Sequence, residues 1–107
     1  MTPALAHYME KRFNAARLSV CQHFIARWLL SRVDALLEIR TTYPAMAKAA
    51  RCTRNTARRS VEILARRGLL TVGDWARGRS GGNLLRFIVP EQDRAELGLA
   101  SAGGLAP

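Results

Sequence analysis

Basic side chains have the clearest chemistry in this sequence, and most of them lie in one segment. Residues 40–90 contain eleven Lys and Arg residues but only two acidic residues, Glu62 and Asp74, a net charge of +9. Residues 1–39 carry +2 and residues 91–107 carry −2, so the middle segment accounts for the +9 of the whole chain. Such a concentration of guanidinium groups is typical of a surface that binds the phosphates of nucleic acid. A solvated Arg-rich face without a partner is the alternative interpretation.

Other kinds of chemistry find little support in the sequence. It shows no pair of carboxylates or Ser-His-Asp set with catalytic spacing, and the glycines near residue 80 are not followed by the Gly-Lys-Ser/Thr of a phosphate-binding loop. His7 and His23 have no neighbours at metal-ligand spacing, and Cys21 and Cys52 are 31 residues apart. We therefore expect no catalysis, no metal and no cofactor, and we expect Cys52 to be a small core residue.

Length and composition limit the class of protein. The chain has 107 residues, of which 49% are hydrophobic, enough for one domain with a modest core. Two cysteines without CxxC spacing favour free thiols in a reducing cytoplasm over a disulfide scaffold. The first residues lack the pattern of a secretory signal, and charges such as Arg27, Arg32 and Asp34 interrupt the apolar stretches. The expected location is the cytoplasm, away from membranes.

Two helices are predicted ahead of the basic segment, within residues 3–38. Apolar residues at spacings of three and four predict the first helix over about 3–17. Ser19 and Gln22 fit a capping box at the start of a second, strongly apolar helix that continues to about residue 38. Its wide apolar face indicates burial on more than one side. Packing within the domain and contact with a partner subunit explain that face equally well.

The basic segment opens with a short strand and a short helix. Residues 39–41 are rich in β-branched side chains and can form a small strand. Thr42 can cap a two-turn, Ala-rich helix over about 43–50, in which Pro44 is tolerated because it lies in the first turn. Small side chains in this helix allow the next helix to pack closely against it.

A longer and more basic helix is predicted to follow after a tight turn. Thr53 can cap this helix, which continues to about residue 67, so that the two helices occupy 42–67. Gly68 then lies at the position after a helix end where a positive φ is favoured. The apolar residues fall on one face and the polar residues on the others: Ala57, Val61 and Leu64 against Arg54, Asn55, Arg58, Arg59, Glu62 and Arg66.

A β-hairpin is predicted over residues 69–89. Apolar strands at 69–72 and 84–89 flank a loop rich in glycine and arginine. The tail, 99–107, is predicted to be disordered because it is short and rich in small residues. The predicted fold class is mainly α with a small β-hairpin, in a single domain over 1–98.

The order of helix, turn, helix, strand, glycine-rich loop and strand resembles the bacterial winged helix-turn-helix family. The resemblance covers residues 43–89, about half of the chain. The turn at 50–53 departs from the family pattern because it lacks glycine, and position 57 has alanine where valine is usual. The residues of this sequence at the motif positions are Thr56, Ala57, Arg59, Val61, Leu64, Gly68, Leu69, Leu70, Asn83, Phe87 and Val89. The chain looks most similar to small plasmid and phage regulators and to replication-linked proteins, with extra N-terminal helices.

This resemblance implies a set of DNA contacts. The second helix of the pair would enter the major groove of double-stranded DNA. The residues expected to contact bases are Arg54, Asn55 and Arg58, since arginine pairs with guanine and asparagine with adenine. The residues expected to contact phosphates are Lys48, Thr53, Thr56 and Arg59. The residues expected to act from the wing are Arg77, Arg79 and Asn83.

The resemblance also implies a function, with alternatives that the sequence leaves open. The expected function is sequence-specific DNA binding by a small transcriptional repressor or a plasmid or phage maintenance factor, which would act as a homodimer. The alternative is an adaptor that binds a protein partner in a replication, transfer or defence complex through the N-terminal helices or Trp75. RNA binding is a weaker option because the chain has few aromatic residues for base stacking.

Overall fold

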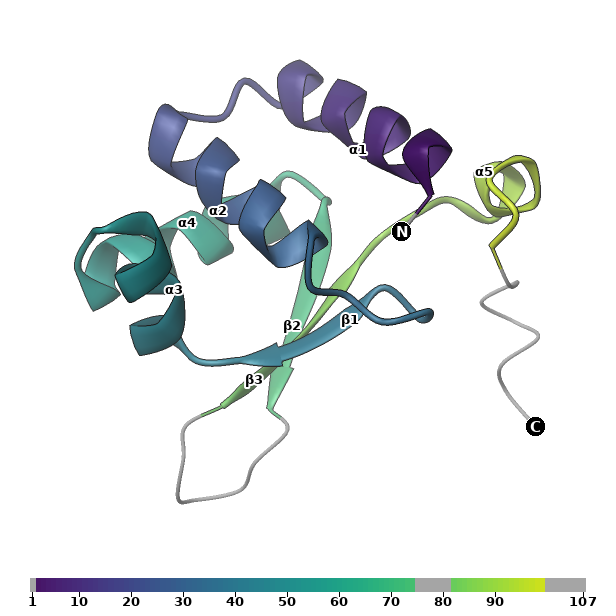
Figure 1. The fold of residues 1–107 in the computed structure, drawn as a ribbon. Helices are drawn as coiled ribbons and strands as arrows, with labels where there is room; N and C mark the ends of the chain where they lie inside the picture. The colour runs from purple at the N-terminus through teal and green to yellow at the C-terminus, as the bar shows by residue number, and fades with distance from the viewer. Residues whose placement is uncertain (1, 75–81, 100–107) are drawn as a thin grey trace.

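A computed structural model of the chain describes residues 2–74 and 82–99. The elements run in the order α1 (Pro3–Ala15), α2 (Val20–Leu30), β1 (Glu38–Thr41), α3 (Tyr43–Ala50), α4 (Arg54–Arg66), β2 (Leu70–Asp74), β3 (Asn83–Phe87) and α5 (Glu91–Glu96). In Figure 1, α2 lies between α1 and the α3–α4 pair, and the ends of β2 and β3 near residues 74 and 83 point away from α1. The prediction of a mainly helical chain with a small β-sheet is confirmed.

Helices α2, α3 and α4 begin where their capping residues predict. Ser19 and Gln22 form the expected capping box, in which each side chain bonds the backbone N–H of the other residue. The hydroxyls of Thr42 and Thr53 accept hydrogen bonds from backbone N–H groups in the first turns of α3 and α4. Gly68 has φ +72° after the end of α4, as predicted. Local sequence signals therefore fix most helix boundaries.

The predicted end of the second helix is wrong. That helix, α2, ends at Leu30 instead of continuing to residue 38. The Asp34 carboxylate accepts hydrogen bonds from the backbone N–H groups of Leu36 (2.8 Å) and Glu38 (3.0 Å), and such local bonds compete with a helix. Leu37 has φ +62°, which no helix residue adopts, and its side chain is buried. Residues 31–37 therefore form a turn that leads into β1.

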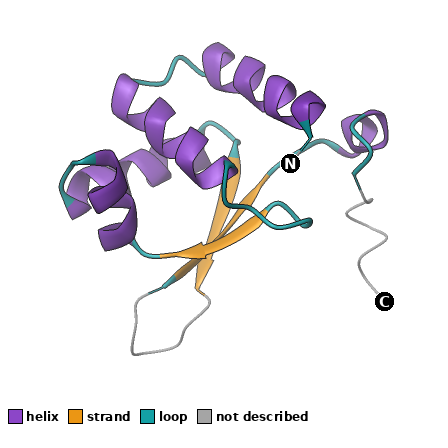
Figure 2. Ribbon diagram, in the orientation of Figure 1, coloured by secondary structure: helices purple, strands orange, loops and turns teal. Residues whose placement is uncertain are grey.

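The three strands form one antiparallel sheet in the order β1–β3–β2 (Figure 2). The predicted hairpin of β2 and β3 therefore gains the short strand β1 on its other side. Leu85 of β3 pairs with Ile39 of β1 and with Val72 of β2, so β3 is the central strand. Across the β1–β3 pair, Arg86 donates to the Glu38 carboxylate through Nε (2.9 Å) and through a second guanidinium nitrogen. This cross-strand ion pair helps to fix the register.

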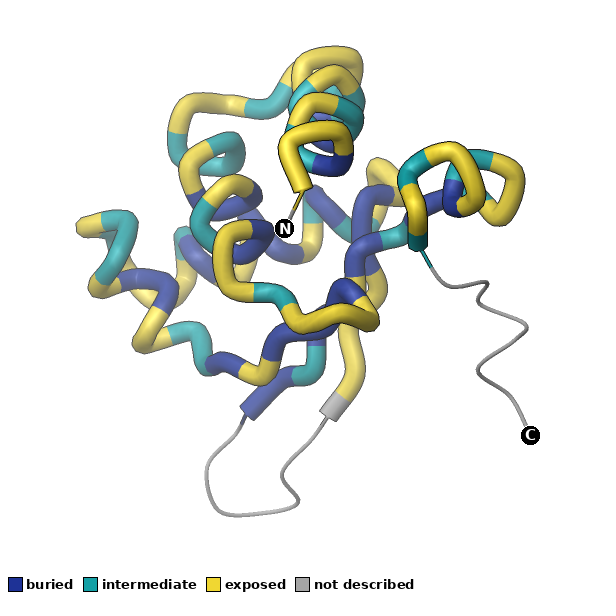
Figure 3. The backbone as a smooth tube through the Cα atoms, turned by 45° about the vertical axis from the view of Figure 1, so that its right-hand side comes forward, coloured by how far each residue is buried: buried dark blue, intermediate teal, exposed yellow. Residues whose placement is uncertain are grey.

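The core lies between the sheet and the helices. Buried residues follow the inner faces of the helices and the strands (Figure 3). Phe13 of α1 and Phe87 of β3 are both fully buried, and their ring centroids are 6.0 Å apart. Within the residues that the structure describes, no helix is both long and apolar enough to cross a membrane.

Helix α5 follows the sheet and is joined to α1. The polar sequence of this segment carries no pattern that predicts a helix. The Tyr8 hydroxyl of α1 donates to the Asp93 carboxylate at 2.5 Å, and Arg94 Nε donates to the Val89 carbonyl at 3.1 Å. The Arg12 guanidinium donates to the carbonyl oxygens of Ile88 and Gly68. Helix α1 is thus bonded to chain segments more than fifty residues away.

Glu10 links α1 to α2. Its carboxylate accepts hydrogen bonds from Arg27 Nε at 3.0 Å and from a second nitrogen of that guanidinium, and it lies 2.8 Å from His23 Nε2. The hydrogen bonds from Arg27 are the main reason that the pKa of Glu10 lies below its ordinary value of 4.5; burial opposes this shift and His23 adds to it. The carboxylate is therefore stabilised in its charged form in the folded chain.

A pH-dependent stability follows for Glu10. Folding lowers the pKa of Glu10. The stability that Glu10 adds to the folded chain is therefore fully present above pH 4.5, and it is lost as the pH falls through the pKa of the folded state. We expect Glu10→Gln to lower Tm by a few degrees at neutral pH. In acid, the difference in Tm between this variant and the wild type should disappear. Thermal melts across this pH range measure the gap. Glu62→Gln should change Tm far less, because the Glu62 side chain is 53% exposed. A gap that stays constant with pH would contradict the assignment.

Candidate nucleic-acid interface

The α3–α4 pair is joined by a tight turn with defined geometry. Helix α3 ends at Ala50, and the next residue, Arg51, adopts a left-handed conformation (φ +54°). The Cys52 N–H donates to the Ala47 carbonyl at 3.0 Å and the Arg51 N–H to the Lys48 carbonyl at 3.4 Å, the bonds of a Schellman motif. Thr53 then caps α4. The turn thus works without the glycine that the family pattern contains, because Arg51 takes the left-handed conformation.

Strain at Arg51 leads to a prediction. A non-glycine residue in the left-handed region costs about 1 kcal/mol, so Arg51→Gly is expected to raise Tm by about 2–5 °C. Arg51→Ala removes the same charge but keeps a Cβ in that conformation, so it should give no such increase. Thermal unfolding of the two variants separates backbone strain from charge. An equal rise in both variants would show that charge repulsion dominates.

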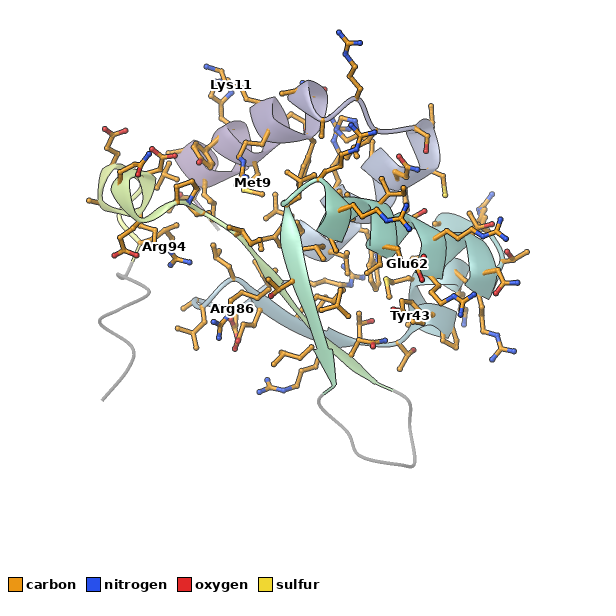
Figure 4. The ribbon with its side chains drawn as sticks, turned by 180° about the vertical axis from the view of Figure 1, so that it is seen from behind. Met9, Lys11, Tyr43, Glu62, Arg86 and Arg94 are labelled. Atoms are coloured by element: carbon orange, nitrogen blue, oxygen red, sulfur yellow. The ribbon has the colours of Figure 1, made fainter. Side chains whose placement is uncertain are left out.

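Helix α4 is divided sharply into a buried and an exposed face. Ala57, Val61 and Leu64 are fully buried, and Ser60 is 3% exposed with its hydroxyl bonded to the Thr56 carbonyl at 2.8 Å. Figure 4 shows Glu62 on this helix, with nitrogen-tipped side chains that reach outward near it. The exposed residues are Arg54, Asn55, Arg58, Arg59, Glu62, Arg66 and Arg67. All three predicted base-contacting residues are therefore exposed in the first two turns of α4.

Helical spacing places Arg59 in the middle of the exposed face. Asn55, Arg59 and Glu62 are related by steps of four and three residues, so they share one face of α4. Arg54 and Arg58 lie beside that face, also four residues apart. Arg59, expected as a phosphate contact, is thus at least as central on the exposed face as Arg58.

Most of the basic side chains near α4 have no acidic partner among the described residues. Arg58 Nε lies 3.9 Å from Glu62 Oε1, but both side chains are more than half exposed, so this ion pair is weak. Arg86 and Arg27, by contrast, are held by Glu38 and Glu10. The basic residues of segment 40–90 that are exposed and lack an ion pair within the described part are Arg40, Lys48, Arg51, Arg54, Arg59, Arg66 and Arg67. Their charge is available to an external anion.

The two threonines predicted to hold phosphates have a structural role. Thr53 Oγ1 accepts from the Thr56 N–H at 3.1 Å and donates its own hydrogen to Thr56 Oγ1 at 3.0 Å. The Thr53 hydroxyl therefore has no hydrogen left to donate, whereas Thr56 keeps its hydroxyl hydrogen. Lys48 is exposed on α3, as a phosphate contact requires.

The predicted wing residues divide into two groups. Arg77 and Arg79, together with Trp75, lie outside the residues that the structure describes. Asn83 is described and is only 7% exposed, between Thr41 and Asp74 in the register of the sheet. Its Nδ2 has no hydrogen-bond partner among the described residues. This placement favours a structural role at the base of the hairpin over the expected DNA contact.

Arg40 is a further candidate contact, which the sequence alone shows only as part of the basic segment. In β1 the neighbours of Arg40, Ile39 and Thr41, are buried while Arg40 is exposed. The alternation of a strand predicts this exposure, but only after the strand itself has been placed.

The described residues contain no group of three His, Cys, Asp or Glu side chains that could hold a metal ion. No family model, curated protein or solved structure matches the chain.

Proposed function

We propose that this chain is a winged helix-turn-helix protein that binds double-stranded DNA sequence-specifically. One observation supports this most: a helix with one fully buried face exposes Arg54, Asn55, Arg58 and Arg59 in its first two turns. The element order agrees, since α2, β1, α3, α4 and the β2–β3 hairpin follow one another and β1 pairs with β3. In this interpretation α3 and α4 are the helix-turn-helix and the hairpin is the wing.

The proposed contacts follow from the exposed side chains. The first two turns of α4 enter the major groove, where Arg54 and Asn55 contact base edges, together with Arg58 or Arg59. Lys48 and the Thr56 hydroxyl contact phosphates on the flanking strand. Arg40, Arg66 and Arg67 add positive charge around this site. Arg77 and Arg79 of the wing remain proposed contacts.

The proposed biological role is that of a small regulator. A single module of this size buries little DNA surface, so we propose that the protein binds as a homodimer. Repression of transcription, or control of plasmid or phage replication and maintenance, are the roles that suit such a binder. The proposed location is the cytoplasm, on DNA.

Selection from a random pool of duplexes tests the proposal without knowledge of the target. The enriched duplex should bind with sub-micromolar affinity, more tightly than a scrambled duplex or the single strand, in fluorescence anisotropy. If about six basic residues neutralise phosphates, log K should fall with log salt with a slope of about −5. No enrichment, or equal affinity for scrambled DNA, would contradict sequence-specific binding.

A second candidate is a winged-helix adaptor that binds a protein. Val20 is 90% exposed and Phe24 is 48% exposed, one helical turn apart on α2, and such apolar exposure is found at protein contacts. Capture of host proteins by the purified chain after nuclease treatment tests this function, with Val20→Asp/Phe24→Asp as the control. Capture that depends on Arg54 and is lost after nuclease would favour DNA binding.

A further inference from the structure

A hollow of about 480 Å³ lies beside α5, where three segments that are far apart in sequence meet. The segments are the start of α1, the turn 31–37 that follows α2, and residues 97–99 at the end of α5. Small-molecule sites in proteins have volumes of about 300–1,000 Å³. In Figure 1, α5 and the α3–α4 pair lie on opposite sides of the molecule, so this hollow is remote from the proposed DNA contacts.

Aliphatic side chains make up most of the lining of the hollow. Leu5 of α1 and Leu37 of the turn are buried, so they lie at its bottom. Val33, Leu97 and Leu99 are half-buried and pack against the core around them. A ligand that fills this space must therefore have an apolar body, because most of the contacts that the hollow offers are with hydrocarbon.

Asp34 is the only charged side chain among the described residues that line the hollow. Its Oδ1 atom accepts hydrogen bonds from the backbone N–H groups of Leu36 and Glu38. Its own N–H donates to the Glu38 carbonyl at 2.9 Å, and its carbonyl accepts from the Leu37 N–H at 3.0 Å. Within the described part of the chain, Oδ2 has no hydrogen bond and the carboxylate has no ion pair. The turn thus fixes a carboxylate oxygen that can still accept from a donor.

The end of α5 gives the hollow a defined wall. Gly98 has φ +71°, a conformation that favours glycine, and the Leu99 N–H donates to the Arg94 carbonyl at 2.8 Å, which closes the end of the helix. The hydrogen bond from Tyr8 ties α5 to α1. The lining is therefore in place before a ligand arrives, which lowers the cost of binding.

We propose that this hollow is a binding site for a small organic cation. The apolar body of such a ligand packs against the aliphatic lining, and its ammonium group donates to Asp34 Oδ2, since a charge-assisted hydrogen bond is stronger than a neutral one. The neighbouring segment also favours a cation, because residues 91–99 contain Glu91, Asp93 and Glu96 but only one basic residue, Arg94. Such a site is independent of DNA binding.

Three phenyl compounds that differ only in their head group test the site. Phenylbutylamine carries an ammonium, phenylbutanol a neutral hydroxyl and phenylbutanoate a carboxylate. We expect the full chain to bind the amine with a Kd below about 1 mM and about fivefold more tightly than the alcohol. In amide NMR spectra, the amine should shift the signals of Leu36, Glu38 and Gly98 and leave those of Asn55 and Arg59 unchanged. The carboxylate should shift none of the first three.

Asp34→Asn tests the role of the carboxylate. The asparagine Oδ1 still accepts from the N–H groups of Leu36 and Glu38, so the turn is kept, but the atom that replaces Oδ2 is a nitrogen that only donates. The variant should bind the amine about fivefold more weakly and the alcohol about equally well. Glu96→Gln is the matched control, because it removes the same charge from an exposed position on α5 outside the lining. It should weaken amine binding by less than about twofold.

The results that would overturn the proposal are distinct. Equal affinity of the wild type for the amine and the alcohol would exclude a cation site, and this comparison decides even if Asp34→Asn fails to fold. Equal losses in Asp34→Asn and Glu96→Gln would show a general charge effect. If Leu105→Asp binds the amine and the wild type does not, the C-terminal residues of the chain itself occupy the hollow and the proposal fails.

Discussion

Arg54→Ala/Arg58→Ala is expected to bind the selected duplex about 30-fold to 10⁴-fold more weakly than the wild type. Each arginine that pairs with a base contributes about 1–3 kcal/mol of discrimination, and the two are on the exposed side of α4. Neither side chain is needed for folding, because Arg54 has no ion pair among the described residues and Arg58 has only a long one to Glu62. Anisotropy titrations with the selected and the scrambled duplex measure the loss.

The two titrations also separate base contacts from phosphate contacts. If both arginines contact bases, affinity should fall for the selected duplex and change much less for the scrambled one. If they contact phosphates, both affinities should fall and the salt slope should decrease by about one for each arginine. The double variant thus tests the role of the two residues as well as their importance.

Lys11→Ala/Arg17→Ala is the matched control. It removes the same two charges from exposed positions outside the basic segment, and Lys11 lies on α1, away from Glu62 of α4 in Figure 4. Remote charges are screened beyond about 10 Å at ordinary salt, so we expect less than about a threefold loss. Equal losses in both double variants would show that net charge alone attracts DNA, and would contradict recognition by α4.

Features that depend on neighbouring residues were predictable from the sequence. Ser19, Thr42 and Thr53 cap helices because a side-chain oxygen can bond an N–H three residues later, whatever the rest of the fold does. The buried and exposed faces of α4 follow from its periodicity in the same way. These local rules were sufficient to predict the exposure of Arg54, Asn55 and Arg58.

Features that depend on distant residues were not predictable. The pairing of Glu38 with Arg86 joins residues 48 positions apart, and nothing in either segment alone selects the other. Asn83 was expected to contact DNA from the wing, but it is only 7% exposed where it pairs with Thr41 of β1 and Asp74 of β2. Tertiary packing, rather than local preference, decides both.

The N-terminal helix α1 is part of the folding unit rather than an attachment to it. Phe13 contacts Phe87 of the central strand, and Arg12 and Tyr8 bond to segments that follow β3 or precede β2. The surface on which the DNA contacts are proposed is built on this same sheet and core. A change in α1 should therefore reduce DNA binding through stability, without any contact between α1 and DNA.

Phe13→Ala is accordingly expected to destabilise the chain by about 3–5 kcal/mol, the usual cost of removing a fully buried phenylalanine. Since small domains are stable by only about 5–15 kcal/mol, Tm should fall by roughly 15–30 °C. Phe24→Ala makes the same chemical change at a side chain that is 48% exposed, and should cost less than about 1.5 kcal/mol. Thermal and urea unfolding measure both values.

At a temperature where Phe13→Ala remains folded, it should bind the selected duplex as the wild type does, because Phe13 only supports the fold. Similar stabilities for the two variants would mean that α1 is not part of the core.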